Sequence, residues 1–428
     1  MTTVPTAEVG SNTDDLLELV ERLVETPTVT GNERPGQEVV IEYLKSMGLE
    51  PDIWVPEESA LTDHAGYART SVTAEVGFEG RPNVAVRVPG SGDGPTLTVG
   101  GHIDVVDVTE DEWTRDPWEL TREGETLYGR GVADMKGGLA AVLYTVKTVL
   151  NSEVDLAGDL IVQSTIEEEA GGTGGALATI ERGYLPDAAA IAEPSDIPNI
   201  TVASAGVMYF EVTVPGVSAH AAWGHEGDNA IGNATLVYQA LEDLDRERKD
   251  RIDFEPAYRA NPGLEGNVTN INIGQIEAGD WPSTLPSRAT MRGRVGWPPG
   301  ESRETVRAQI EAAVAGVTDR DDWAVDAAPT VDWVGWQAAP HWTDSDSAVA
   351  RLAMETAEAV TGETGAFTGG NGGMDERFYK RYYDVPSVSV GPTPHNIHGA
   401  DEHTSVASLV ETSRTYARVI TEYCGVTD

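Results

Sequence analysis

Apolar and polar positions along the first 200 residues predict alternating helices and strands. Residues 13–29 and 36–50 carry apolar side chains at helical spacing, and the second helix is expected to end at Gly48. Helical patterns also cover 135–150 and 174–185. Short apolar segments typical of buried strands lie at 82–90, 95–106, 159–169 and 188–196. Apolar strands that alternate with helices predict an α/β domain on a mostly parallel sheet.

The pattern changes near Thr201. A half-buried strand, a helix, two further strands and a helix follow in this order: 203–222, 229–248, 267–279, 288–297 and 302–316. Such an order predicts a smaller α+β unit with two layers and antiparallel strands.

The first pattern returns from about Trp336. Two helices, at 345–362 and 405–424, flank a strand at 385–392. We therefore expect one domain made of residues 1–202 and 335–428, with a second domain of residues 203–334 inserted into it.

The charge of the chain is strongly negative and spread along its length. Its 428 residues include 71 acidic and 29 basic side chains, a formal net charge of −42, and only five lysines. Such a surface repels nucleic acid phosphates, so we expect no nucleic-acid partner. It favours a halophilic protein, since molar salt screens charges within about 3 Å. A mildly acidic mesophilic protein is the alternative.

The sequence also bears on the compartment. No apolar run approaches the roughly 20 residues that a membrane span needs. The N-terminal segment lacks the basic start and the apolar stretch of a signal peptide. The single cysteine, Cys424, cannot form an intramolecular disulfide. We therefore expect a soluble, cytoplasmic protein with no membrane partner.

Candidate metal ligands fall where predicted strands end or helices begin. His102 and Asp104 are two residues apart at a strand end, so they point to one face. The other candidates are Asp134 before a helix, Glu167, Glu168, Glu169 and Glu193 at strand ends, and His398 in a loop. Open α/β sheets bind ligands at this edge. Two histidines and three carboxylates suit a pair of divalent cations, with zinc favoured over cobalt or manganese. Asp104 would accept the second ring proton of His102.

Each of these features has a plainer interpretation. Three successive glutamates in so acidic a chain can be solvated surface, and a lone His-x-Asp is more often structural than functional. The glycine-rich segment 171–176 lacks the Lys-Ser/Thr ending of a phosphate loop. The remaining histidines are interpreted as surface or packing residues: His64, His225, His341, His395 and His403.

Taken together, the motifs resemble the zinc deacylase and carboxypeptidase family of acetylornithine deacetylase, succinyl-diaminopimelate desuccinylase, aminoacylase and glutamate carboxypeptidase. The matching segments occur in family order: GHIDVV, GRGVADMKGG, EEEAGGTGGA, AEPSD, GVSAHAA, GDWPSTLPSRATMRGRVGWPPGE, GGMDERFY and HGADE. The resemblance implies a catalytic zinc domain and an inserted dimerisation or lid domain, and hence a homodimer.

The resemblance also implies roles for the clustered residues. The ligands of one zinc ion would be His102, Asp134 and Glu193, and those of the other Asp134, Glu169 and His398. Asp134 would bridge the two ions, and a cis peptide would precede Met135. Glu168 would be the general base, because zinc lowers the pKa of bound water towards about 7 and Glu168 can accept its proton.

Further roles follow from the same resemblance. His220 matches a histidine that stabilises the oxyanion, often from the partner subunit. Arg294 would bind a substrate carboxylate, and Asp375 and Arg377, near the pocket, would also bind substrate. The sequence departs from the family at Glu167, where an aspartate is usual, at Ser283, where an asparagine is usual, and after SAHAA, where a proline is missing. These departures leave the role of Glu167 and the substrate contacts open.

We therefore expect a zinc-dependent amidohydrolase, with two metal ions in each subunit, that acts on N-acyl amino acids or related small molecules. A metallo-carboxypeptidase or dipeptidase with the same ligands is the close alternative. An inactive binding protein on the same fold is a third hypothesis, and the presence of Glu168 and every ligand argues against it. The sequence leaves the acyl group, the amino acid and the occupancy of each metal site open.

Overall fold

The computed structural model describes residues 9–10, 13–152, 154–251, 258, 267 and 269–427. Most of the N-terminal segment that we examined for a signal peptide lies outside these residues. The chain forms two units, which are described separately. Unit 1 comprises Met1–Ala203, Trp342–Gly369 and Met374–Asp428, and unit 2 comprises Ser204–His341 and Gly370–Gly373.

A large sheet forms the middle of unit 1. Nine strands of the described residues take part, in the order β1-β2-β6-β3-β7-β15-β8-β13, with β14 paired to β8. Their bounds are β1 Asp52–Trp54, β2 Asn83–Val88, β3 Gly94–His102, β6 Gly158–Thr165, β7 Ala188–Ile191, β8 Ile200–Ser204, β13 His341–Trp342, β14 Phe367–Gly370 and β15 Ser387–Ser389. The central strands β6, β3, β7 and β15 run parallel, and β1, β2 and β8 pair antiparallel.

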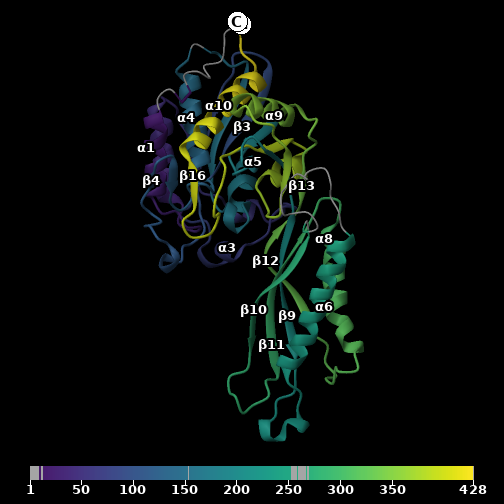
Figure 1. The fold of residues 1–428 in the computed structure, drawn as a ribbon. Helices are drawn as coiled ribbons and strands as arrows, with labels where there is room; N and C mark the ends of the chain where they lie inside the picture. Colours follow the sequence, from purple (N-terminus) through teal and green to yellow (C-terminus); the bar gives the residue numbers. More distant parts are fainter. Residues whose placement is uncertain are drawn as a thin grey trace. The chain divides into compact units, whose positions relative to one another are not determined.

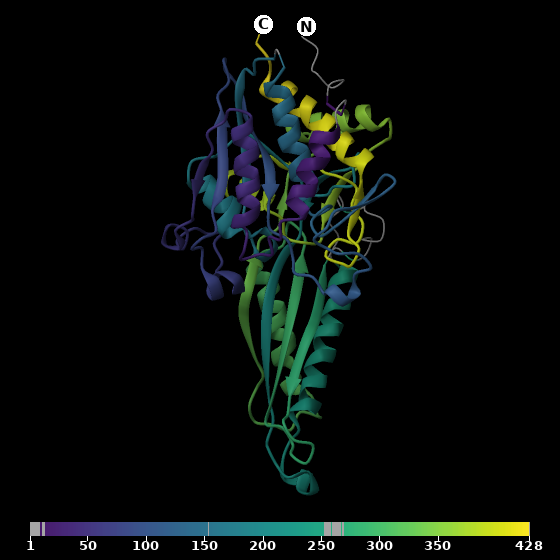
Figure 2. The ribbon, with the colours of Figure 1, turned by 90° about the vertical axis from the view of Figure 1, so that its left-hand side faces the viewer.

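Helices cover this sheet. Their bounds are α1 Thr13–Val24, α2 Arg34–Ser46, α3 Ser71–Val76, α4 Lys136–Leu150, α5 Ala178–Glu181, α9 Ala348–Thr361 and α10 Val406–Cys424. Helix α4 is buried along most of its length and packs against α1, α10 and β3 (Figure 1), as expected of a helix that is apolar on nearly all sides. Figure 2 shows α1 and α2 beside each other at the N-terminal end of the chain.

Two features of unit 1 hold elements close to the carboxyl ends of the central strands. A Cβ added at Gly138, in the first turn of α4, would lie 2.2 Å from the carbonyl oxygen of Ala192. Only glycine therefore allows α4 to approach the end of β7 this closely. A small antiparallel sheet of β4 (Thr121–Glu123), β5 (Thr126–Tyr128) and β16 (His403–Ser405) anchors the chain that follows His398.

The described residues of unit 2 form two layers, a sheet and the helices that cover one side of it (Figure 1). The antiparallel strands are β9 Gly206–Pro215, β10 Asn270–Ala278, β11 Arg288–Trp297 and β12 Thr330–Ala338, in the order β10-β11-β9-β12. The helices are α6 Ala230–Arg251 and α8 Arg303–Ala315. Alternate residues of β9, including Phe210 and Val212, are buried in the core that the sheet shares with both helices. Strand β12 crosses the expected domain boundary at residues 334 and 335.

The predicted fold class is confirmed, with a mainly parallel sheet in one unit and a separate antiparallel sheet in the other. In the part of the chain that the structure describes, no helix is both long enough and apolar enough to cross a membrane.

Candidate active site

The predicted ligands of unit 1 gather at one edge of its sheet. His102 ends β3, Glu169 lies just after β6 and Glu193 just after β7. Asp134 immediately precedes Met135 and α4, and His398 lies in the loop before β16. The parallel strands β3, β6 and β7 end at the same edge of the sheet, so residues from distant parts of the sequence meet there.

His102 is held with one ring nitrogen toward this cluster. The ring is 1% exposed, and Nδ1 lies 2.9 Å from the backbone carbonyl oxygen of Asp104. A carbonyl can only accept, so Nδ1 carries the proton. Nε2 lies 3.3 Å from Oδ1 of Asp134 and 3.5 Å from Oε1 of Glu193. The structure differs from our expectation in the acceptor atom, because the Asp104 carboxylate is 3.6 Å from Nδ1.

Asp134 lies between the two histidines. Its Oδ1 faces His102, and its Oδ2 lies 3.4 Å from Nε2 of His398. Burial alone would raise the pKa of Asp134, but the nearby imidazoles of His102 and His398 outweigh burial and lower it. Nε2 of His398 is also 3.0 Å from Oε2 of Glu169. The Asp134–Met135 peptide is cis.

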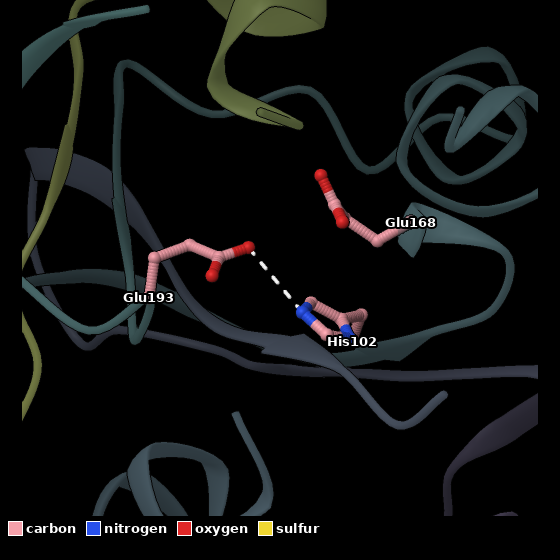
Figure 3. A group of neighbouring side chains, drawn as sticks. All are labelled: His102, Glu168 and Glu193. Atoms are coloured by element: carbon pink, nitrogen blue, oxygen red, sulfur yellow. Dashed lines mark ion pairs between the residues drawn. The ribbon is translucent and has the colours of Figure 1, made fainter. Parts of the chain in front are cut away.

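Glu168 lies close to His102 and Glu193. Figure 3 shows Glu168, Glu193 and His102 as neighbours from different segments of the chain, with the carboxyl group of Glu193 directed at His102. Each of these three residues offers one ligand atom within 4.8 Å of the others, as do His102, Asp134 and Glu169. Burial is the main cause that raises the pKa of Glu168 well above its ordinary value, and the Glu193 carboxylate adds to it.

The carboxylate of Asp104 fixes the backbone that carries the two glutamates. Its Oδ1 accepts the N–H of Glu168 at 3.1 Å, and its Oδ2 accepts the N–H of Glu169 at 3.2 Å. Oδ2 also accepts the hydroxyl of Thr30 at 2.9 Å. Asp104 is fully buried, so these hydrogen bonds compensate its loss of water.

The cluster fits divalent cations. Nε2 of His102 is buried and has no hydrogen-bond partner among the described residues, although two carboxylates face it. Burial raises the pKa of Glu169 to about 7 and that of Glu193 to about 8. Several carboxylates crowded at low exposure are costly without positive charge. Imidazole nitrogen and carboxylate oxygen are the ligands that zinc and related metals prefer.

Comparison with known proteins assigns the family. The model of peptidase family M20/M25/M40 matches residues 98–422. The chain belongs to this family. The expected resemblance is thereby confirmed, and with it the class of enzyme, a metal-dependent hydrolase of amide bonds.

Individual relatives match nearly the whole chain. N-formyl-4-amino-5-aminomethyl-2-methylpyrimidine deformylase of Halalkalibacterium halodurans is 28% identical over 443 positions, 98% of this chain and 96% of the relative. Succinyl-diaminopimelate desuccinylase of Gluconacetobacter diazotrophicus is 27% identical over 432 positions, 96% of this chain and 97% of the relative. An M20 family metallo-carboxypeptidase of Sulfolobus solfataricus has the same fold, with a TM-score of 0.73, 16% identity and coverage of 96% and 99%.

Glu402 is a buried residue of this M20 site that sequence reasoning missed. Its Oε1 accepts the N–H groups of Ala133 and Asp134 at 2.9 and 3.0 Å. Its Oε2 accepts the N–H of Gly131 and a guanidinium N–H of Arg130, the latter at 2.6 Å. Glu402 therefore holds the loop of Asp134. Its place four residues after His398, within HGADE, was the available signal.

Arg377 lies beside the site, and two of its guanidinium N–H groups donate to backbone carbonyls. The side chain is 2% exposed, Nη1 donates to the carbonyl of Met374 at 2.7 Å, and Nη2 donates to the carbonyl of Gly171. Both contacts are to backbone carbonyls, which supports a structural function for Arg377. Its binding of substrate stays a prediction. Asp375 is also buried, 3.8 Å from Arg377, and burial raises its pKa to about 7.

Two predicted site residues belong to unit 2. His220 is exposed, and its Nδ1 accepts the N–H of Ala222 at 3.1 Å. A neutral ring with this acceptor carries its proton on Nε2, where it can donate a hydrogen bond. Arg294 on β11 donates to Oδ1 of Asn270 at 3.2 Å and to the carbonyl of Asn371 at 2.7 Å. Burial lowers the pKa of Arg294.

Proposed function

We propose that this M20 family chain is a deacylase that hydrolyses the amide bond of N-acyl amino acids or related small amines. Two relatives that match it over nearly their full lengths are named as a deformylase and a desuccinylase. Both names describe removal of a small acyl group from an amine. The similarity to a carboxypeptidase, at 16% identity, is a similarity of fold, so a peptide substrate is the second candidate.

Two divalent cations, zinc before cobalt or manganese, would be held by the clustered side chains of unit 1. The proposed ligands of the first are His102, Asp134 and Glu193, and those of the second are Asp134, Glu169 and His398. Such ions lower the pKa of water and polarise an amide carbonyl. Asp134 suits the bridging position because each of its oxygens faces a different histidine.

Glu168 carries the proposed proton transfer. Its buried carboxyl group lies close to His102 and Glu193, and Asp104 holds its backbone N–H. A carboxylate with a raised pKa can take a proton from the attacking water and release it to the leaving amine nitrogen. The position of Glu168 beside His102 and Glu193 is the observation on which the proposed function rests.

Two further residues, His220 and Arg294, carry proposed roles. We propose that Nε2 of His220 donates to the oxyanion of the tetrahedral intermediate and that Arg294 binds a substrate carboxylate. The negative charge supports a protein adapted to high salt. The family motifs support a homodimer that pairs through the inserted domain. We propose a cytoplasmic location, as the sequence predicts.

A substrate comparison tests the proposal. The protein is stripped with a chelator and reloaded with zinc in high salt. N-acetylornithine, succinyl-diaminopimelate and N-formyl amines are then assayed beside dipeptides. We expect release of the acyl group from at least one acylated amine at a higher kcat/KM than for any dipeptide. Cleavage of dipeptides alone would reject the deacylase in favour of the peptidase.

A further inference from the structure

Glu167, the first of the three glutamates, has a backbone conformation that needs support. Its φ is +66°, in the left-handed region, and it is fully buried. This region costs a residue with a Cβ roughly 1–2 kcal/mol. A residue keeps it only where its surroundings determine the conformation, and such residues cluster at functional sites.

The side chain of Glu167 is bound to the start of α3. Oε1 accepts the hydroxyl of Thr70 at 2.7 Å and also the hydroxyl of Thr73. Thr70 in turn caps α3, since its hydroxyl oxygen accepts the N–H of Thr73 at 2.9 Å. Hydrogen bonds to a carboxylate are among the stronger ones. They join residues more than 90 positions apart in the sequence.

The neighbouring glycines leave space for this contact. A Cβ added at Gly174 would lie 2.6 Å from Oε2 of Glu167 and 2.2 Å from the ring of Phe78. The N–H of Gly172 donates to the carbonyl of Glu167 at 2.6 Å. The glycine-rich segment after the three glutamates therefore closes a tight turn around Glu167.

We propose that Glu167 is a positioning residue that, with Thr70 and Thr73, sets the direction in which Glu168 points. Asp104 fixes the N–H groups of Glu168 and Glu169 from the end of β3. Thr70 and Thr73, at the start of α3, hold the side chain of Glu167, the residue before these two. The backbone of the segment is thus held from both sides. This inference rests on the proposed role of Glu168 as the general base.

The test removes one hydroxyl and keeps the shape of the side chain. Thr73→Val loses the hydrogen bond to Glu167, whereas Thr73→Ser keeps the hydroxyl and is the matched control. Hydrogen–deuterium exchange of residues 166–172 is measured on metal-free protein, and kcat and KM on zinc-loaded protein. For Thr73→Val we expect exchange about tenfold faster and kcat about tenfold lower, the size of one charged hydrogen bond, with KM unchanged. Thr73→Ser should match the parent in both.

Glu167→Asp tests the same contact from the carboxylate side. Its side chain is one methylene shorter and cannot reach both threonines, so its exchange and kcat should change as in Thr73→Val. The double variant should be no worse than either single one. Parent-like exchange or parent-like kcat in both single variants would overturn the inference. The exchange measurement needs no turnover, so it still tests this contact if no acylated amine is hydrolysed.

Discussion

Oδ1 of Asp104 accepts the backbone N–H of Glu168 at 3.1 Å, which ties the end of β3 to the loop after β6. The proposed base, Glu168, is therefore directed by a residue that follows a different strand. Misplacement of a reacting group by about 1 Å can cost about 100-fold in rate. The geometry of this contact is accordingly as important to the proposed mechanism as the identity of the base.

Asp104→Asn tests this contact. An amide has only one acceptor oxygen, so the N–H of Glu168 or of Glu169 loses its partner. We expect kcat to fall about 10- to 100-fold and the free energy of unfolding to fall by about 1–3 kcal/mol. The exposed Asp107 provides the control, because Asp107→Asn should change neither. Equal kcat for the two variants would show that the Asp104 contact does not position the base.

Metal binding is tested by thermal melting, without turnover. Zinc at about 100 times its dissociation constant should raise the free energy of unfolding of the metal-free protein by about 2.7 kcal/mol, and its melting temperature should rise accordingly. His102→Ala removes a proposed ligand and should abolish most of the increase in melting temperature that zinc causes. His225→Ala, which changes a histidine with an exposed side chain, should retain it. A full zinc-dependent increase in the His102 variant would contradict the proposed ligand set.

Arg377→Lys separates a structural function from substrate binding. A lysine cannot replace a guanidinium that donates to two separate carbonyls. We expect a loss of about 1–3 kcal/mol in the free energy of unfolding and a parent-like KM. Arg381→Lys, at an exposed position, should leave stability unchanged. A higher KM at unchanged stability would return Arg377 to the substrate site.

His220→Ala tests the proposed oxyanion donor. Loss of one such donor lowers kcat by about 10²–10³-fold. Because His220 is exposed, the melting temperature should hardly change. His225→Ala changes a second histidine of the same segment and should keep its activity. Parent-like kcat in the His220 variant would remove this residue from the mechanism.

The sequence predicted the long elements and the clustered ligands for clear physical reasons. Helix α4 and strands β3, β6 and β7 are strongly apolar, and each of these strands is followed within a few residues by a charged motif. Strand β12 was missed because it is a partly exposed edge strand. Strands of three residues, such as β4 and β16, are too short to show a periodic pattern.

The supporting residues of the site could not be predicted in the same way. Glu402 acts on a loop about 270 positions away, and Thr70 acts on Glu167 across 97 positions. Neither contact leaves a local pattern in the sequence, because it depends on how distant segments pack. Arg377 lies in a recognisable motif, but only its burial shows that backbone carbonyls occupy its guanidinium.

Glu168→Gln tests the central claim most directly. The variant and its control, Glu112→Gln at an exposed position, are loaded with zinc, and bound metal and melting temperature are recorded. Initial rates are then measured on the best acylated amine. Removal of the proton acceptor should lower kcat by about 10²–10⁴-fold, with bound zinc and stability unchanged. Undiminished kcat in the Glu168 variant at full zinc occupancy would contradict the account.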